Sequence, residues 1–366
     1  MSVLYVTEQG AMIRFTEGRI IVGKEKKILQ EVPAFKLDQI VAVGNVILTA
    51  GAATFCMQNG VDVAFLSTTG KYRGRLQPEF AKSALLRQRQ YERAIDPEFC
   101  RQTAAAIVAG KIKNMLAMTR QQRRLRDEGA ASIKEMERLL ARVPAGRDLD
   151  TLRGFEGAAT VAYFKAFRAA IKGDWEFHAR EYHPPTGEVN ALLSFGYSLL
   201  YNNIFGAVNV VGMDPYMGYF HRPRHGHAAL VSDLVEEYRA VIVDRLTLTA
   251  LNKRLLLKDD FFTDQEGRIR LQQPAIKRFL ALYAGALNEV VYYPLGKIRT
   301  SFRQLIELQT RHLARVLLGE DPAYQPFDAE ASANGRPATA NDKPAAANAT
   351  NAGAAEMPSA DNQGAE

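Results

Sequence analysis

The sequence is poor in cysteine, with only Cys56 and Cys100 in 366 residues. They lie far apart and show no CxxC or Cys-His pattern, so neither a disulfide framework nor a structural zinc site is predicted. The first residues, MSVLYVTEQGAMIRF, lack the basic region and the long apolar run of a secretory signal. The most apolar stretch, 189–212, is interrupted by asparagines and predicts a buried helix, not a membrane span. We expect a cytoplasmic protein without membrane contact.

Basic residues outnumber acidic ones over most of the chain. The net charge is +7, but the tail 328–366 alone carries −4, which leaves +11 on the rest. A basic body favours a polyanionic partner such as nucleic acid, although charge alone does not establish one. The 47% of apolar residues and the length are sufficient for two ordinary domains.

The chain changes character near residue 80. Before it, short β-branched and aromatic runs alternate with turn residues. After it, apolar residues recur at spacings of three and four, with one extended excursion expected over 261–274. We predict an α+β protein of two domains: a small β-rich, sandwich-like domain over 1–80 and a larger all-α domain over 81–320. Residues 321–366 are predicted to be a linker and a disordered, acidic tail rich in Ala and Asn, because such a segment cannot offset its ordering entropy.

Two basic stretches are candidates for DNA contact. Residues 111–126 hold six basic residues and no acid, and a helix would place Lys113, Arg120 and Arg124 on one face. Phosphate contact needs no precise spacing, so these residues and Arg123 are predicted to bind DNA. A solvated helix face is the alternative, which the lack of acids disfavours.

The second basic stretch surrounds Lys297 and Arg299. It is predicted to join a loop to the start of a helix, where free N–H groups attract phosphate. An ordinary loop between two helices explains the same residues equally well.

Glu156 lies inside a mostly apolar helix predicted over 151–170, between Gly154 and Gly157. A carboxylate among small and aromatic residues is costly unless it is paired or bound to a metal. A glutamate in the first turn of a helix, favoured by the helix dipole, is the competing interpretation.

The stretch GYFHRPRHGHAALVSDLVEEYR combines a loop with a predicted helix. It contains three histidines and three acids: His221, His225, His227, Asp233, Glu236 and Glu237. Asp233 and Glu236 are one helical turn apart and can reach a common point. Asp233 and Glu237 are also at helical spacing, so that pair is a further possibility. An imidazole with carboxylates suits Mg²⁺ or Mn²⁺. Surface histidines followed by a solvated helix flank are the alternative.

Together, the motifs RGFEGAATVAYF, DPYMGYFH and LVSDLVEEYR resemble those of the CRISPR-associated endonuclease and integrase that captures spacers. The resemblance runs from about residue 2 to about 320. The length of the chain and the residues of its motifs are most similar to those of the type I-C variant. It implies that Glu156, His221 and Glu236 bind Mn²⁺ or Mg²⁺. Asp233 would lie beside them, as an outer ligand or a second acid.

The resemblance also implies an activity and partners. The family cuts DNA and joins the 3′-hydroxyls of a captured double-stranded fragment to a repeat, which requires no protein nucleophile. It works as homodimers, joined through the β-rich domain and bridged by a small second adaptation protein. Competing functions are a structure-selective repair nuclease and an inactive DNA-binding scaffold. We assign no catalytic role to His225 or His227, and we expect the acidic tail to be dispensable for chemistry.

Overall fold

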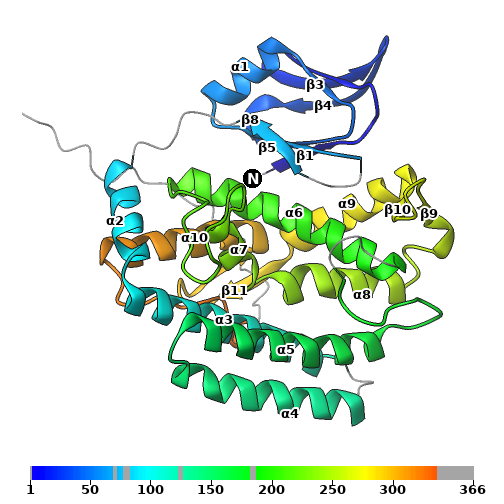
Figure 1. Cartoon of the computed structure of the whole chain (residues 1–366). Coiled ribbons are helices and arrows are strands. Elements are labelled where there is room, and N and C mark those ends of the chain that lie inside the picture. The colour runs from blue at the N-terminus through cyan, green and yellow to red at the C-terminus, as the bar shows by residue number, and fades with distance from the viewer. Residues whose placement is uncertain (1, 69–71, 77–82, 123–126, 182–186, 336–366) are drawn as a thin grey trace, which may run out of the picture.

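The computed structural model describes residues 2–68, 72–76, 83–122, 127–181 and 187–335. No helix in these ranges combines the length and the apolar character that crossing a bilayer requires. The N-terminal part forms two sheets and a nine-residue α-helix (Figure 1). Its elements are β1 (Ser2–Val6), β2 (Met12–Thr16), β3 (Arg19–Lys24), β4 (Lys27–Pro33), β5 (Leu37–Val43), β6 (Ile47–Leu48), α1 (Ala50–Gln58), β7 (Asp62–Leu66) and β8 (Tyr72–Leu76).

The two sheets of this N-terminal domain share one core. The first has the order β1-β5-β7-β8 and the second β4-β3-β2-β6. Leu4 and Ile40 from the first sheet pack with Ile13 and Ile20 from the second, and Cys56 of α1 joins them. The prediction of a β-rich start is therefore confirmed.

Strand β5 connects this domain to the rest of the molecule because it is buried on both faces. Ile40 faces the small core, whereas Val41 and Val43 belong to the large helical core. Side chains alternate along a strand, so one central strand serves both cores. Its neighbours β1 and β7 run parallel to it, an arrangement typical of strands covered on both sides.

The remainder is mainly helical. Its helices are α2 (Ala84–Ala94), α3 (Pro97–Arg120), α4 (Asp127–Arg142), α5 (Leu149–Ala170), α6 (Gly187–Val211), α7 (Ala229–Val235), a π-helix (Arg239–Asp244), α8 (Arg245–Asn252), α9 (Gln273–Asn288), α10 (Phe302–Leu318) and α11 (Ala329–Asn334). Two hairpins interrupt them: β9 (Phe261–Thr263) with β10 (Ile269–Leu271), and β11 (Val290–Tyr293) with β12 (Ile298–Ser301).

These elements refine two predictions. The first hairpin lies within the extended excursion predicted over 261–274 and confirms it. The second hairpin replaces a predicted loop. The prediction of an all-α domain over 81–320 is therefore only approximate. Disorder from residue 328 onward is wrong for 328–335, because Asp328 caps α11 by accepting hydrogen bonds from the N–H groups of Glu330 and Ala331.

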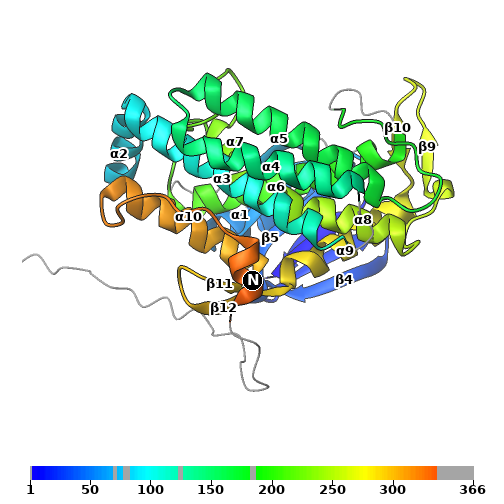
Figure 2. The ribbon, with the colours of Figure 1, turned by 90° about the horizontal axis from the view of Figure 1, so that it is seen from below.

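Helix α3 is central to the helical body. The β-rich domain lies on one side of the body above α6, and the α4–α5 pair covers the opposite side (Figures 1 and 2). Asp96 caps α3 by accepting hydrogen bonds from the N–H groups of Glu98 and Phe99, and Pro97 occupies its first turn. The residues from Gly110 to Thr119 are buried except Lys113. Any charged group on the buried faces of α3 must therefore be matched by a partner.

A buried polar network ties α5, α6 and the π-helix together. The Asp244 carboxylate accepts hydrogen bonds from Tyr163 Oη at 2.8 Å and Tyr197 Oη at 2.5 Å. Burial raises the pKa of Asp244 to about 6, although both tyrosines act in the opposite direction. Each of the three helices is thus fixed relative to the other two.

This pKa predicts a pH-dependent stability. As pH rises from about 4 to 6, the unfolded chain releases the Asp244 proton first, so the free energy of unfolding falls by about 3 kcal/mol. Denaturant unfolding of wild type and Asp244→Asn at several pH values checks this. The wild type should lose stability relative to the variant across that interval, and parallel curves would contradict the prediction.

Candidate active site

The predicted helix carrying the acids is not continuous. Helix α7 ends at Val235, turn residues follow, and the chain then forms the π-helix before α8 begins at Arg245. π-helical turns are frequent at functional sites because they alter the direction of side chains. Here Glu236 and Glu237 lie at the break and face different partners.

Glu236 and Glu156 converge on one buried lysine. The Lys111 ammonium pairs with Glu236 Oε2 at 2.6 Å and also forms an ion pair with Glu156 Oε1. The Lys111 and Glu236 side chains are 7% and 4% exposed, whereas Glu156 is 22% exposed. The structure thus brings together acids that lie 80 residues apart, from α5 and from the break after α7.

Lys111 is one of the six basic residues of 111–126, but it is not among the residues predicted to bind DNA. Helical spacing places it on a stripe with Ile107, Val108, Met115 and Met118, all of which are buried. A lysine in an apolar stripe signals a buried, paired cation, and this signal was present in the sequence.

Glu156 is not a first-turn residue. Asp148 caps α5 by accepting a hydrogen bond from Thr151 N at 2.7 Å, which places Glu156 two turns into the helix. The flanking Gly154 and Gly157 leave open space, since a Cβ at either would meet nothing within 4 Å. The exposed side of Glu156 is therefore accessible to a ligand.

Asp233 positions His221. The buried carboxylate accepts backbone hydrogen bonds from Tyr219, Phe220 and His221 at 2.6, 3.0 and 2.8 Å. Its Oδ1 also contacts His221 Nδ1 at 2.8 Å. Gly218 allows this approach, because a Cβ there would lie 2.7 Å from Asp233 Oδ2. Both Asp233 oxygens are therefore used to hold the loop.

This contact determines the tautomer of a neutral His221. A carboxylate can only accept, so Nδ1 donates and Nε2 keeps its lone pair, the arrangement found in metal-binding histidines. The His221 side chain is about one third exposed. His225 lies exposed on the loop, whereas His227 Nε2 contacts Ser232 Oγ at 3.2 Å.

The electrostatics of the site keep Glu236 charged. Burial alone would raise its pKa, but Arg239, Lys111 and His221 lower it to about 2. Burial likewise opposes the charge on Lys111, and Glu236 and Glu156 outweigh it and raise the lysine pKa. The site therefore holds two carboxylates around a cation, with the His221 imidazole close enough to act on Glu236.

The donor set suits a hard divalent cation. Within the described residues no group of three His, Cys, Asp or Glu side chains is arranged to hold a metal ion as it stands. Two carboxylates nevertheless share a positive charge that the Lys111 ammonium supplies, and Glu236 Oε2 receives no aligned hydrogen bond from the part of the chain that the structure describes. Carboxylate oxygens with one imidazole match Mn²⁺ or Mg²⁺, so the residues fit such an ion.

Glu237 faces away from this centre. Its carboxylate accepts hydrogen bonds from Tyr324 Oη and from Phe327 N, the latter at 2.8 Å. Burial raises its pKa to about 7. Asn114 on α3 joins the same cluster by donating to the carbonyls of Glu237 and Phe327. Glu237 thus anchors the segment after α10 instead of flanking a solvated helix.

The basic face of α3 is covered by acids from elsewhere in the chain. Lys113 pairs with Asp328 at 3.2 Å, and Arg120 pairs with Glu330 at 2.6 Å and Glu137 at 2.7 Å. The lack of acids within 111–126 was therefore misleading, because α4 and the segment at α11 supply them. The predicted DNA contacts Arg123 and Arg124 lie outside the described residues.

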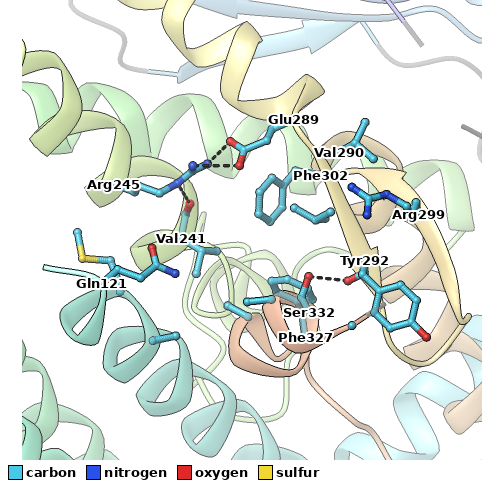
Figure 3. Close-up of a pocket in the computed structure, with 16 residues that line it drawn as sticks. Gln121, Val241, Arg245, Glu289, Val290, Tyr292, Arg299, Phe302, Phe327 and Ser332 are labelled. Carbon is cyan, nitrogen blue, oxygen red and sulfur yellow. Dashed lines mark hydrogen bonds and ion pairs between the residues drawn. The ribbon is translucent and has the colours of Figure 1, made fainter. Parts of the chain in front are cut away.

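Lys297 and Arg299 do not lie at a helix N-terminus. Lys297 is in the β11–β12 turn with a φ of 51°, and Arg299 is on β12 opposite Tyr292. Helix α10 starts later, capped by Ser301. Arg299 lines a cavity of about 400 Å³, and Ser332 of α11 donates a hydrogen bond to the Tyr292 carbonyl at 2.6 Å. Figure 3 shows these residues around the cavity.

Comparison with known proteins identifies the family. The profile described as CRISPR associated protein Cas1 matches residues 4–285. CRISPR-associated endonuclease Cas1 3 of Thermus thermophilus is 35% identical, and the match covers 89% of this chain and 97% of that protein. CRISPR-associated endonuclease Cas1 of Mycobacterium tuberculosis is 32% identical, with 87% and 95% covered. The chain belongs to the Cas1 family of CRISPR-associated endonucleases.

Solved structures agree on the fold. A Cas1 protein from Thermotoga maritima has a TM-score of 0.77 at 25% identity, and the match covers 89% of this chain and all of that one. A casposase bound to integration product also scores 0.77, at 20% identity, with 89% and 93% covered. A chain of a Cas6-RT-Cas1–Cas2 complex scores 0.77 at 24% identity, with 89% of this chain and 36% of that chain covered.

Removal of metal tests whether the carboxylates of Glu156 and Glu236 need the positive charge of Lys111. In chelator, Lys111→Met leaves two carboxylates without their cation and should cost about 3–5 kcal/mol of stability. Mn²⁺ should then raise the melting temperature of the variant more than that of wild type, because the ion restores the missing charge. Lys113→Met is the matched control, since Lys113 is exposed. An Mn²⁺ shift in Lys111→Met no larger than in wild type would contradict this.

Proposed function

We propose that this protein is the metal-dependent endonuclease and integrase of CRISPR spacer acquisition, in the variant that accompanies type I-C systems. The observation that carries the proposal is the convergence of Glu156 and Glu236 on one buried positive charge, beside an imidazole whose Nε2 keeps its lone pair. The family and the similarity to a casposase bound to integration product support the same activity.

Glu156, His221 and Glu236 would hold Mn²⁺ or Mg²⁺. A bound divalent ion supplies charge stabilisation at phosphorus and orients the attacking oxygen. The residues of this chain provide the rest: Asp233 fixes the imidazole, and the open space beside Gly154 and Gly157 admits the DNA backbone. The attacking group is a 3′-hydroxyl of the captured fragment, so no side chain needs to act as nucleophile.

Partners follow from the same proposal. A small second adaptation protein would bridge two homodimers, in line with the Cas6-RT-Cas1–Cas2 complex to which one structural relative belongs. The N-terminal domain is suited to the homodimer contact because β4 is a sheet edge that exposes apolar side chains. Ile28 and Leu29 on that strand are 54% and 42% exposed, and Phe35 just after it is 83% exposed.

The assigned ligands can be tested individually. Glu156→Ala, His221→Ala and Glu236→Ala should each abolish Mn²⁺-dependent strand transfer into repeat-bearing supercoiled DNA, because each removes a ligand. DNA binding and folding, measured by gel shift and thermal unfolding, should persist. His225→Ala on the same loop is the matched control and should keep full activity. Strand transfer retained in any of the three variants would refute its assignment as a ligand.

The predicted DNA contacts Lys113, Arg120, Lys297 and Arg299 remain part of the proposal, and the first two generate a salt test. Asp328→Asn with Glu330→Gln removes acids that compete with phosphate for these cations. Duplex binding should tighten, and its logarithmic salt dependence should steepen by roughly one to two, since each additional phosphate contact adds about 0.9. Adding Lys113→Gln and Arg120→Gln should cancel the gain. An unchanged slope would show that this face does not contact DNA.

A further inference from the structure

Thr160 lies one helical turn after Glu156 on α5 and contacts its carboxylate. The Thr160 hydroxyl donates a hydrogen bond to Glu156 Oε1 at 3.0 Å. The Lys111 ammonium donates to the same oxygen. A carboxylate oxygen offers two lone pairs, so these two donors use the accepting capacity of Oε1. One oxygen of the proposed metal ligand is therefore occupied by the protein itself.

This contact differs from those of other threonines in the helices of the chain. The hydroxyls of Thr119, Thr249 and Thr310 each donate to the backbone carbonyl four residues earlier, at 2.8, 2.8 and 2.7 Å. That bond is the usual one for a threonine inside a helix. The Thr160 hydroxyl instead donates to the side chain four residues earlier. Its orientation therefore serves the Glu156 carboxylate.

The second oxygen of Glu156 remains for a ligand. Both hydrogen bonds that Glu156 accepts from the described part of the chain end on Oε1. The Glu156 side chain is 22% exposed, and the space beside Gly157 is open. A cation that approaches from solvent would thus meet Oε2.

Threonine is suited to fix the rotamer of Glu156. Its β-branched side chain has few χ1 rotamers, so its hydroxyl keeps its direction on the helix. A glutamate side chain has more rotatable bonds, and ordering it costs entropy unless a partner holds it. Because the hydroxyl is neutral, it orients the carboxylate without changing the net charge of the site, to which Lys111 contributes the cation.

We propose that Thr160 is a positioning residue of the metal centre: its hydroxyl, together with the Lys111 ammonium, holds Oε1 of Glu156 and leaves Oε2 for a divalent cation. Ligating carboxylates are commonly held by such hydrogen bonds, whose loss weakens metal affinity. Asp233 holds the His221 ring in a comparable way. The inference rests on the proposed function in taking Glu156 as a ligand.

The test measures the Mn²⁺ affinity of the full-length protein without DNA, from the EPR signal of unbound Mn²⁺. Thr160→Val keeps the shape of the side chain but removes its donor, so the dissociation constant should rise about tenfold, as for other lost hydrogen bonds to metal ligands. Thr160→Ser keeps the hydroxyl and should stay within about threefold of wild type. Thr249→Val is the matched control, because its hydroxyl donates only to a backbone carbonyl, and it should leave the affinity unchanged.

Strand transfer gives a second measurement. The Mn²⁺ concentration for half-maximal rate should rise in Thr160→Val by the same factor as the dissociation constant. A lower maximal rate with an unchanged dissociation constant would show that Thr160 acts on DNA, and would overturn the proposal. Equal losses of Mn²⁺ affinity in Thr160→Val and Thr160→Ser would overturn it too, because the hydroxyl would then not be the group that matters.

Glu156→Ala separates this inference from the proposed function. Loss of Mn²⁺ binding in Glu156→Ala, combined with wild-type affinity in Thr160→Val, would overturn the inference and keep Glu156 as a ligand. Unchanged Mn²⁺ binding in Glu156→Ala would overturn both. Melting curves recorded in chelator check that each variant is folded.

Discussion

The ion triad of Lys111, Glu156 and Glu236 constrains the whole helical body. A charge on the buried face of α3 is tolerable only if opposite charges reach it, and here they come from α5 and from the break after α7. Three segments distant in sequence must therefore pack in one way. One turn further along α3, Asn114 adds Glu237 and Phe327 to the same arrangement. The elements of the proposed active site are thus held by the interaction that balances its charge.

Much of this organisation was predictable from the sequence. Local patterns placed the β-rich start, the helices and the first hairpin, because alternation and helical spacing reflect which faces are buried. The acids and the histidine of the proposed site were selected by their motifs, and the structure brings Glu156 and Glu236 to one lysine. Helical spacing could also have revealed the burial of Lys111. The break after α7 could not be predicted, since the stretch has the apolar spacing of one continuous helix. The chain departs from a continuous helix at the place where Glu236 and Glu237 make their tertiary contacts.

The segment after α10 shows the opposite failure. Its composition resembles disorder from residue 328, yet Phe327 is buried against Tyr238, and α11 pairs with cations of α3. Gly110 explains how the chain reaches this place, because a Cβ there would lie 2.5 Å from Pro326. Sequence windows assess a segment by its own residues, whereas the order of this segment depends on partners that lie up to 215 positions away in the sequence. Apolar and charged contacts with other elements together supply the stabilisation that the segment's own sequence lacks.

The π-helical turn has a consequence for how this chain tolerates insertions and deletions. An α-helix advances about 100° per residue, so the one-residue surplus of a π-turn sets the rotation of α7 relative to α8. Loss of a single residue between Arg239 and Asp244 would relax the turn to an ordinary helix and rotate the preceding acids by that angle. Glu236 and Glu237 would then both miss their partners while every side chain named at the proposed metal centre remained present. Residue spacing in this segment is therefore as much a determinant of the site as residue identity.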